Sequence, residues 1–223
     1  MRTRTTTATA AAALTTAVAL LLTACGGGSD SDDSGKDEIA GADTGASASA
    51  SPSPSPSASE DGVDRPEIKL PADVKNVFEG AKTGDSVKDA VLADNERMIN
   101  SIDEAITVDA EEHPALKFYS KDNALVAAAT YVQTFYEGGT TWTGSTRYYD
   151  REVTLSGDNA ATVTYCGDET ESYSKDRKTK KVKKTPGDAD DYVSYNARME
   201  KNADGVWQTV NVVSERGSEK CQP

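Results

Sequence analysis

Apolar residues recur with two different periods in the two halves of the chain beyond residue 65. Over 85–106 and 122–137 the spacing is helical, which predicts two amphipathic helices. A short helix is also expected over 71–80, with Val74, Val77 and Phe78 on one side. From residue 143 onward the period is two, which predicts strands over 143–155, 160–166 with a continuation to 175, 192–200 and 206–213.

Glycine and proline mark where these elements end. Pro114 is expected to separate the helices, and Gly138-Gly139 to end the second one with a left-handed cap. Turns are expected at Gly157-Asp158-Asn159 and at Asn202-Ala203-Asp204-Gly205. Helices followed by a strand meander predict an α+β fold, with the helices packed on one face of an antiparallel sheet.

The N-terminal segment has the three parts of a secretory signal. Arg2 and Arg4 precede an apolar run over 8–22, and small residues follow it. The run is shorter than the roughly 20 residues that a membrane-spanning helix needs. Leu22-Thr23-Ala24-Cys25 resembles a bacterial lipobox, in which the cysteine receives a diacylglyceryl group and becomes the mature N-terminus. The expected location is therefore the extracellular face of the cell membrane, held by a lipid anchor. A cleaved signal with an incidental Cys25 is the alternative.

The segment after the lipobox is nearly devoid of large apolar residues. Between residues 26 and 64 only Ile39 and Val63 are sizeable and apolar, so the segment cannot bury enough surface to fold. The predicted organisation is a lipoprotein signal peptide over 1–24, a disordered linker rich in Gly, Ser, Asp and Pro over 25–64, and one α+β domain over 65–223.

The net charge of −13 becomes −15 once residues 1–24, which hold two arginines and no acid, are removed. Such an acidic chain argues against nucleic acid as a partner. With Cys25 lipidated, an exported chain keeps Cys166 and Cys221, which predicts one disulfide between them. A redox or metal pair is the alternative, disfavoured because the chain has a single histidine. No metal and no cofactor are expected.

Several short motifs in the second half resemble a known family. They are Tyr165-Cys166-Gly167-Asp168, the strand begun by Ala160-Ala161-Thr162-Val163, Asp204-Gly205-Val206-Trp207, the crossing between Gly139 and Gly144, and the late Cys221. Together they resemble secreted actinomycete lipoproteins of the nuclear-transport-factor-2-like, SnoaL-like or cystatin-like cone fold. The resemblance covers residues 85–223 and implies helices cradled by a strongly curved sheet, with a pocket at the cone mouth. It implies no activity, because that superfamily includes isomerases, dehydratases and binding proteins without catalysis.

No residue is assigned as catalytic from the sequence. His113 lies in a polar loop and is interpreted as a solvated residue. A cone-fold enzyme would direct an acid toward the cavity with a tyrosine as partner, but strand alternation alone does not place any candidate inward. The candidates are Asp150, Glu152, Asp168, Tyr148, Tyr149 and Tyr165. Trp142 and Trp207 are interpreted as core or rim packing.

One basic segment stands out in the acidic domain and is a candidate patch for anionic surfaces such as cell-wall polymers. Its alternative is an ordinary solvated hairpin. The basic residues are Lys175, Arg177, Lys178, Lys180, Lys181, Lys183 and Lys184.

Three function classes remain open at this point. The leading one is a membrane-anchored domain that binds a small apolar ligand or a partner without catalysis. The second is a tethered isomerase or lyase for a small apolar molecule, which needs a buried carboxylate with a raised pKa in a closed pocket. The third is a structural envelope protein that acts through the basic segment and has a filled cone without a cavity. The ligand and the oligomeric state are left open.

Overall fold

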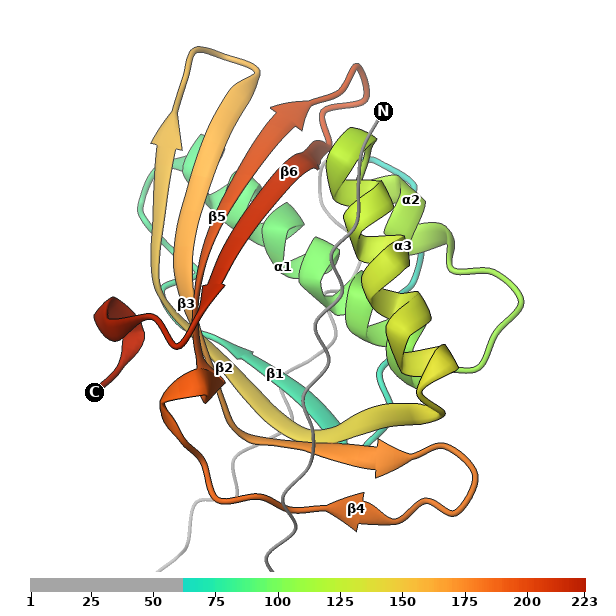
Figure 1. Cartoon of the computed structure of the whole chain (residues 1–223). Helices are drawn as coiled ribbons and strands as arrows, with labels where there is room; N and C mark the ends of the chain where they lie inside the picture. The colour runs from blue at the N-terminus through green and yellow to red at the C-terminus, as the bar shows by residue number, and fades with distance from the viewer. Residues whose placement is uncertain (1–61) are drawn as a thin grey trace, which may run out of the picture. The chain divides into compact units, whose positions relative to one another are not determined.

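The computed structural model describes residues 62–223, which form three helices against a bent six-stranded sheet (Figure 1). The N-terminal signal, Cys25 and almost all of the expected linker lie outside the described residues. The elements are β1 (Val74–Phe78), α1 (Ser86–Thr107), α2 (Pro114–Tyr119), α3 (Asp122–Glu137), β2 (Thr140–Leu155), β3 (Ala160–Asp176), β4 (Val182–Lys183), η1 (Ala189–Asp191), β5 (Tyr192–Lys201), β6 (Trp207–Arg216) and η2 (Glu219–Cys221).

The strands follow the order β1-β2-β3-β5-β6, and β4 pairs with β3 beside this path. All pairs are antiparallel except β1 with β2. The ladder shifts register twice along β2, between Ser145 and Arg147 and between Tyr149 and Glu152. Bulges of this kind bend a strand and increase its twist. The sheet therefore curves around the helices, as expected for an α+β cone.

The short helix expected over 71–80 is wrong, because this segment forms strand β1. Val74 to Phe78 run parallel to β2, with Val74 opposite Gly144 and Phe78 opposite Tyr148. The spacing of Val74, Val77 and Phe78 fits a helix, but so short a segment cannot form a stable helix alone. The open edge of β2 satisfies its backbone groups instead.

The two long helices are confirmed. Asp85 caps α1, since its carboxylate accepts hydrogen bonds from the backbone N–H groups of Val87 and Lys88. Gly139, with a φ of 62°, follows α3 in the left-handed conformation that was expected. Pro114 does separate the helices, but it also opens α2, which the sequence interpretation missed. Proline suits the first position of a helix, because a backbone N–H there would have no acceptor within the helix and its absence costs nothing.

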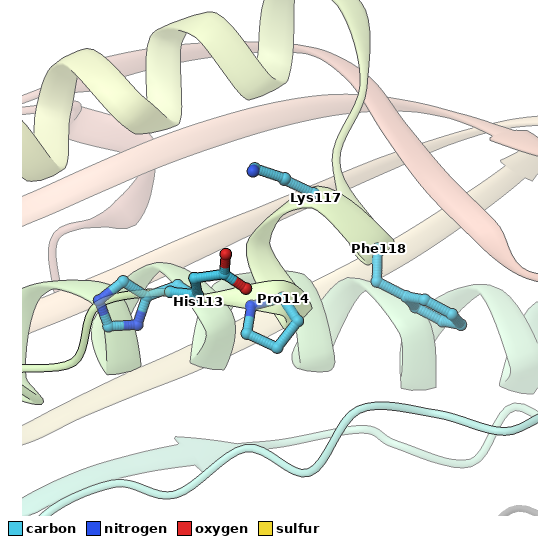
Figure 2. Close-up of a pocket in the computed structure, with 5 residues that line it drawn as sticks. His113, Pro114, Lys117 and Phe118 are labelled. Atoms are coloured by element: carbon cyan, nitrogen blue, oxygen red, sulfur yellow. The ribbon is translucent and has the colours of Figure 1, made fainter.

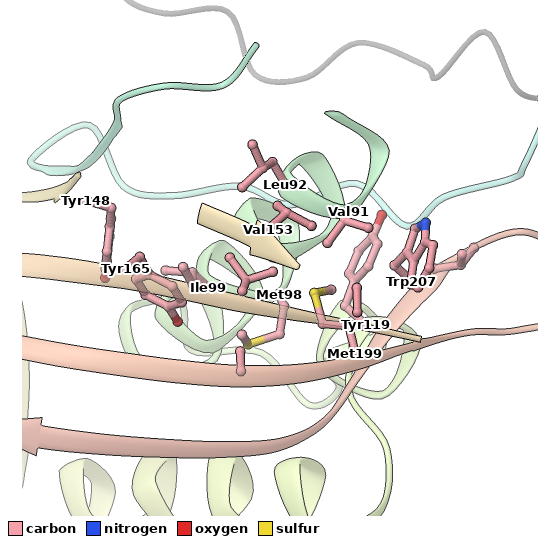
Figure 3. Packing of buried hydrophobic residues seen from close by; sticks show 14 of the residues in the cluster. Val91, Leu92, Met98, Ile99, Tyr119, Tyr148, Val153, Tyr165, Met199 and Trp207 are labelled. Atoms are coloured by element: carbon pink, nitrogen blue, oxygen red, sulfur yellow. The ribbon is translucent and has the colours of Figure 1, made fainter. Parts of the chain in front are cut away.

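The main core lies between α1 and the sheet (Figure 3). Trp207 and Tyr119 are fully buried there, beside Met98 and Met199. The interpretation of Trp207 as core packing is thus confirmed. Within residues 62–223, no helix is both long and apolar enough to cross a membrane.

A buried carboxylate joins three distant parts of the chain around this core. Asp94, on α1, is 1% exposed and accepts hydrogen bonds from Arg65 at 2.7 Å and Arg97 at 2.9 Å. It also accepts one from the backbone N–H of Trp207 at 2.9 Å. Burial raises the pKa of Asp94, and these three donors oppose the rise. Asp94 therefore ties the segment before β1 and the start of β6 to α1.

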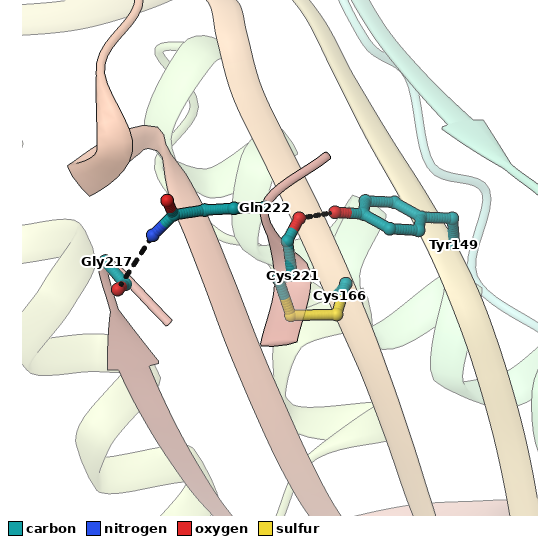
Figure 4. Close-up of a disulfide and its surroundings, with 5 residues drawn as sticks. All are labelled: Tyr149, Cys166, Gly217, Cys221 and Gln222. Atoms are coloured by element: carbon teal, nitrogen blue, oxygen red, sulfur yellow. Dashed lines mark hydrogen bonds between the residues drawn. A yellow bond between two sulfur atoms is a disulfide. The ribbon is translucent and has the colours of Figure 1, made fainter. Parts of the chain in front are cut away.

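The expected disulfide is present and fastens the C-terminal tail to β3 (Figure 4). Cys166 and Cys221 are 55 residues apart, and closing a loop of this length contributes about 4 kcal/mol in the chain-entropy model. The Tyr149 hydroxyl donates to the carbonyl of Cys221, and Gln222 donates to the carbonyl of Gly217 at 3.2 Å.

Candidate functional site

A cavity of about 610 Å³ lies between α1, α3 and the inner face of the sheet. Helix α3 covers it with small side chains, Ala124, Ala127 and Ala128, and with Tyr131 and Phe135 further along the same stripe. Alanines leave room where larger residues would fill the cone. The remaining apolar lining residues are Met98, Ile99, Ile102, Val193 and Val212.

Aromatic rings dominate the cavity wall. Seven of the 14 aromatic residues of the chain line it, namely Tyr131, Phe135, Trp142, Tyr148, Tyr165, Tyr173 and Tyr195. Tyr165 and Tyr195 stack with ring centroids 4.8 Å apart, and Tyr148 meets Tyr165 edge-on at 6.0 Å. Half of the aromatic residues of an aromatic-poor chain are thus gathered on one cavity wall, which makes this wall strongly apolar.

Gly167 of β3 allows two of these rings to lie against the strand. A Cβ atom at this position would lie 3.1 Å from Tyr195 Cε2 and 3.5 Å from Tyr148 Cε1. The missing side chain thus sets the depth at which the rings sit. This is the glycine of the Tyr165-Cys166-Gly167-Asp168 motif.

Asp103, near the C-terminal end of α1, is one of two acids that line this cavity. Its Oδ2 accepts a hydrogen bond from Asn76 Nδ2 at 2.6 Å, and the same amide donates to Asn100 Oδ1 at 2.8 Å. Burial raises the pKa of Asp103 to about 7, helped by the negative charge of Glu169 and opposed by hydrogen bonds from Asn76 and Trp142. At neutral pH, Asp103 can therefore either hold or release a proton.

A second acid, Glu169 of β3, lines the same cavity, but its negative charge is compensated by a neighbouring cation. Arg216 Nη2 lies 2.8 Å from Glu169 Oε2, and the Tyr195 hydroxyl donates to Glu169 Oε1 at 3.3 Å. The Arg216 side chain is half exposed, which places the ion pair at the cavity mouth. The charge of Glu169 is thus compensated by Arg216. Among residues 62–223, the charge that acts on Asp103 is the negative charge of Glu169.

Tyr131 stands at the opening above these two acids. The residue is 47% exposed, and its ring packs edge-on against Phe135 at 5.2 Å. Partial desolvation, together with the charges of Glu169 and Asp103, raises the pKa of Tyr131 to about 12. The hydroxyl therefore stays protonated and can donate a hydrogen bond into the cavity.

The candidates drawn from the sequence divide between the two faces of the sheet. Tyr148 and Tyr165 line the cavity. Asp168 does not, and its carboxylate pairs with Arg147 at 3.2 Å, while hydrogen bonds from Thr170 help to lower its pKa. The others are placed elsewhere: Asp150 and Glu152 are exposed, and Tyr149 binds the C-terminal tail.

The sequence interpretation missed Asp103 and Glu169, the two acids that reach the cavity. A signal for Asp103 was present, because it occupies the apolar stripe of α1 formed by Ile99, Ile102 and Ile106. A carboxylate at such a position faces the interior. Trp142, interpreted as packing, also lines the cavity.

The basic segment forms the hairpin between β3 and β4 and is only partly free. Lys175 pairs with Asp73 at 2.6 Å, and Arg177 donates to the carbonyl of Thr140 at 2.8 Å while lying over the ring of Tyr136. Lys184 lies 5.3 Å from the ring centroid of Tyr173. The exposed lysines of this segment that have no such contact among residues 62–223 are Lys178, Lys180, Lys181 and, on β4, Lys183.

A shallow depression also lies at the start of α2, where the single histidine is found (Figure 2). The His113 and Phe118 rings point in opposite directions in this view, and Lys117 points away from Phe118. His113 is half-buried at the N-cap position, without a capping hydrogen bond from its side chain. In this view these side chains do not converge on a common point.

Comparisons with known proteins return only structural matches. No family model matches the chain, and no curated protein matches its sequence. A ketosteroid isomerase-like protein from Erwinia carotovora atroseptica aligns with a TM-score of 0.42 and 16% identity, over 60% of this chain and 98% of that one. A protein from Shewanella frigidimarina, provisionally assigned as a ketosteroid isomerase, aligns with a TM-score of 0.33 and 12% identity, over 62% and 99%.

Proposed function

We propose that the domain binds a small molecule with an apolar body in the cone cavity. The observation that carries this proposal is the aromatic-lined cavity of about 610 Å³, within the usual size range of ligand pockets. A structural envelope protein needs no cavity, so this feature favours a ligand-binding role over that alternative.

The binding proposal is tested by filling the cavity from α3. Ala127 is exposed and lines the cavity, whereas Ala129 is exposed on the same helix and does not line it. Neopentylbenzene, a neutral apolar probe, is expected to bind the unaltered domain and Ala129→Trp alike. Ala127→Trp is expected to weaken binding at least about tenfold, because the indole occupies the same space. Calorimetry or ligand-observed NMR measures the affinities. No binding to the unaltered domain, or equal binding to both variants, would contradict the proposal.

The proposed location is the extracellular face of the cell membrane, with a diacylglyceryl group on Cys25 and residues 25–64 as a spacer. The arginines and apolar run before the lipobox support it, and two acyl chains suffice for stable anchoring. Protein extracted from membranes is expected to have the mass of the chain from Cys25 plus this lipid. Reduction should add the mass of two hydrogen atoms. Recovery of a soluble protein whose mass includes no acyl chains would contradict the proposed lipid anchor.

The exposed lysines of the β3–β4 hairpin are proposed to contact an anionic surface such as a cell-wall polymer. Lys178, Lys180, Lys181 and Lys183 carry this contact, because Lys175 and Arg177 are engaged within the domain. The attraction is electrostatic and should weaken with salt. Retention of the domain on anionic liposomes measures this contact. The proposal would be contradicted if neither salt nor neutralisation of these lysines changed the retention.

A second candidate function is proton transfer by a tethered isomerase or lyase. Asp103 favours it, because a carboxyl group with a pKa of about 7 in an enclosed cavity can act as a general acid or base near neutral pH. Exchange of C–H hydrogens of a bound molecule for deuterium in D₂O, lost in Asp103→Asn, would establish this function.

A further inference from the structure

We infer that the cavity selects an organic cation, in which a protonated amine or quaternary ammonium group lies beside Asp103 and the apolar body lies among the aromatic rings. This inference rests on the proposed function and names the class of its ligand. Three features of the cavity carry it: the balance of its charges, the state of its ring faces and the surroundings of Asp103.

The cavity contains two carboxylates and one guanidinium. Arg216 pairs with Glu169 at 2.8 Å, so this pair contributes little net charge. Asp103 has hydrogen-bond donors from Asn76 and Trp142, but neither carries a charge. When Asp103 is ionised, the cavity is therefore negative. An anionic ligand would be repelled by ionised Asp103, whereas a cation would supply the counter-charge that Asp103 lacks.

Cations of the protein cover few ring faces of the cavity, although Tyr165 and Tyr195 stack on each other and Tyr148 stacks on Phe78, which covers one face of each. Elsewhere the domain uses such faces, with Arg147 4.2 Å from the centroid of Tyr149 and Arg177 3.7 Å from that of Tyr136. Of the seven cavity rings, only Tyr173 has a cationic side chain over it among residues 62–223, which is Lys184. Aromatic faces carry partial negative charge and are the usual contacts of ammonium ligands.

Binding of a cation should be coupled to the release of a proton from Asp103. The groups that act on Asp103 from the surrounding elements are Asn76 of β1, Trp142 of β2 and Glu169 of β3. The hydroxyls of Tyr131 on α3 and Tyr148 on β2 also face its charge. Since a bound cation favours the ionised carboxylate, binding near neutral pH should release a proton. The affinity for a cation should then increase as the pH rises through about 7, where Asp103 ionises.

The test uses three probes of one shape and different charge: benzyltrimethylammonium, its neutral carbon analogue neopentylbenzene, and phenylmethanesulfonate. Calorimetry at about pH 6 and about pH 8 measures their affinities for the unaltered domain. At the higher pH the cation is expected to bind about tenfold tighter than the neutral probe, and the anion least. The preference should shrink at the lower pH.

Two variants show whether Asp103 is the source of the preference. In Asp103→Asn the ratio of cation to neutral affinity is expected to fall toward one. Asp109→Asn removes the same charge from an exposed position just beyond α1 and should keep the ratio. Neutral binding equal to or tighter than cation binding would overturn this inference and leave the proposed function standing. Failure of all three probes to bind would overturn the proposed function and the inference with it.

Discussion

Gly144→Ala is expected to destabilise the domain by more than about 4 kcal/mol, a large part of the roughly 5–15 kcal/mol that stabilises a typical domain. Gly144 has a φ of 111°, and a Cβ atom there would lie 2.0 Å from the carbonyl oxygen of Glu171. That oxygen belongs to the backbone of β3, so it cannot move without breaking the ladder. Gly144 is also opposite Val74 of β1, and any shift would disturb three strands. Urea unfolding measures the loss.

Gly157→Ala separates steric overlap from backbone strain. Gly157 also has a positive φ, 79°, but nothing lies within 4 Å of the position of its Cβ. Alanine there should cost only about 1–2 kcal/mol, the usual penalty for a left-handed conformation. If both variants lost the same stability, the close contact between Gly144 and Glu171 would not be the cause.

Asp103→Asn is expected to make the domain more stable at neutral pH, by about 2–4 kcal/mol. The pKa of Asp103 is about 7 in the folded state and 3.8 in the unfolded chain. Between these values the folded state holds one proton more than the unfolded state, so this group lowers the free energy of unfolding as the pH rises. Asparagine stays neutral and removes this slope, while its side-chain oxygen can still accept from Asn76.

The measurement is the free energy of unfolding of both proteins from about pH 4 to about pH 8. The difference between them should be near zero at the lower end, grow up to about pH 7 and then level off, because Asp103 is then ionised in both states. The exposed Asp109→Asn should show no such trend. A constant difference at every pH would mean that Asp103 ionises normally in the fold. An acid that lowers the stability of the fold in this way is typical of functional sites.

Long amphipathic elements were predictable because their pattern is local. The helices over 86–107 and 122–137 and the four long strands lie close to their expected positions, since burial of one face decides both type and register. Strand β1 was not predictable, because five residues carry too little periodicity and the edge of β2 decided their conformation. Helix α2 was missed for a similar reason, since its six residues depend on packing against α1.

The candidate site was only partly predictable. Tyr148 and Tyr165 were among the candidates, but alternation could not tell the cavity face from the outer face, because bulges in β2 change which residues point inward. Glu169 and Arg216 lie on different strands, and their pairing is a property of the curved sheet.

The sequence by itself determined the α+β class, the order of the main elements and the pairing of Cys166 with Cys221, because periodicity and cysteine number constrain them. The expected lipid anchor on Cys25 also rests on the sequence alone. Only the tertiary structure decided that the cone holds a cavity, that Asp103 meets Glu169 in it, and that Lys175 and Arg177 are held within the domain. The reason is physical: a side chain's pKa, contacts and access to a ligand depend on neighbours brought together from distant parts of the chain.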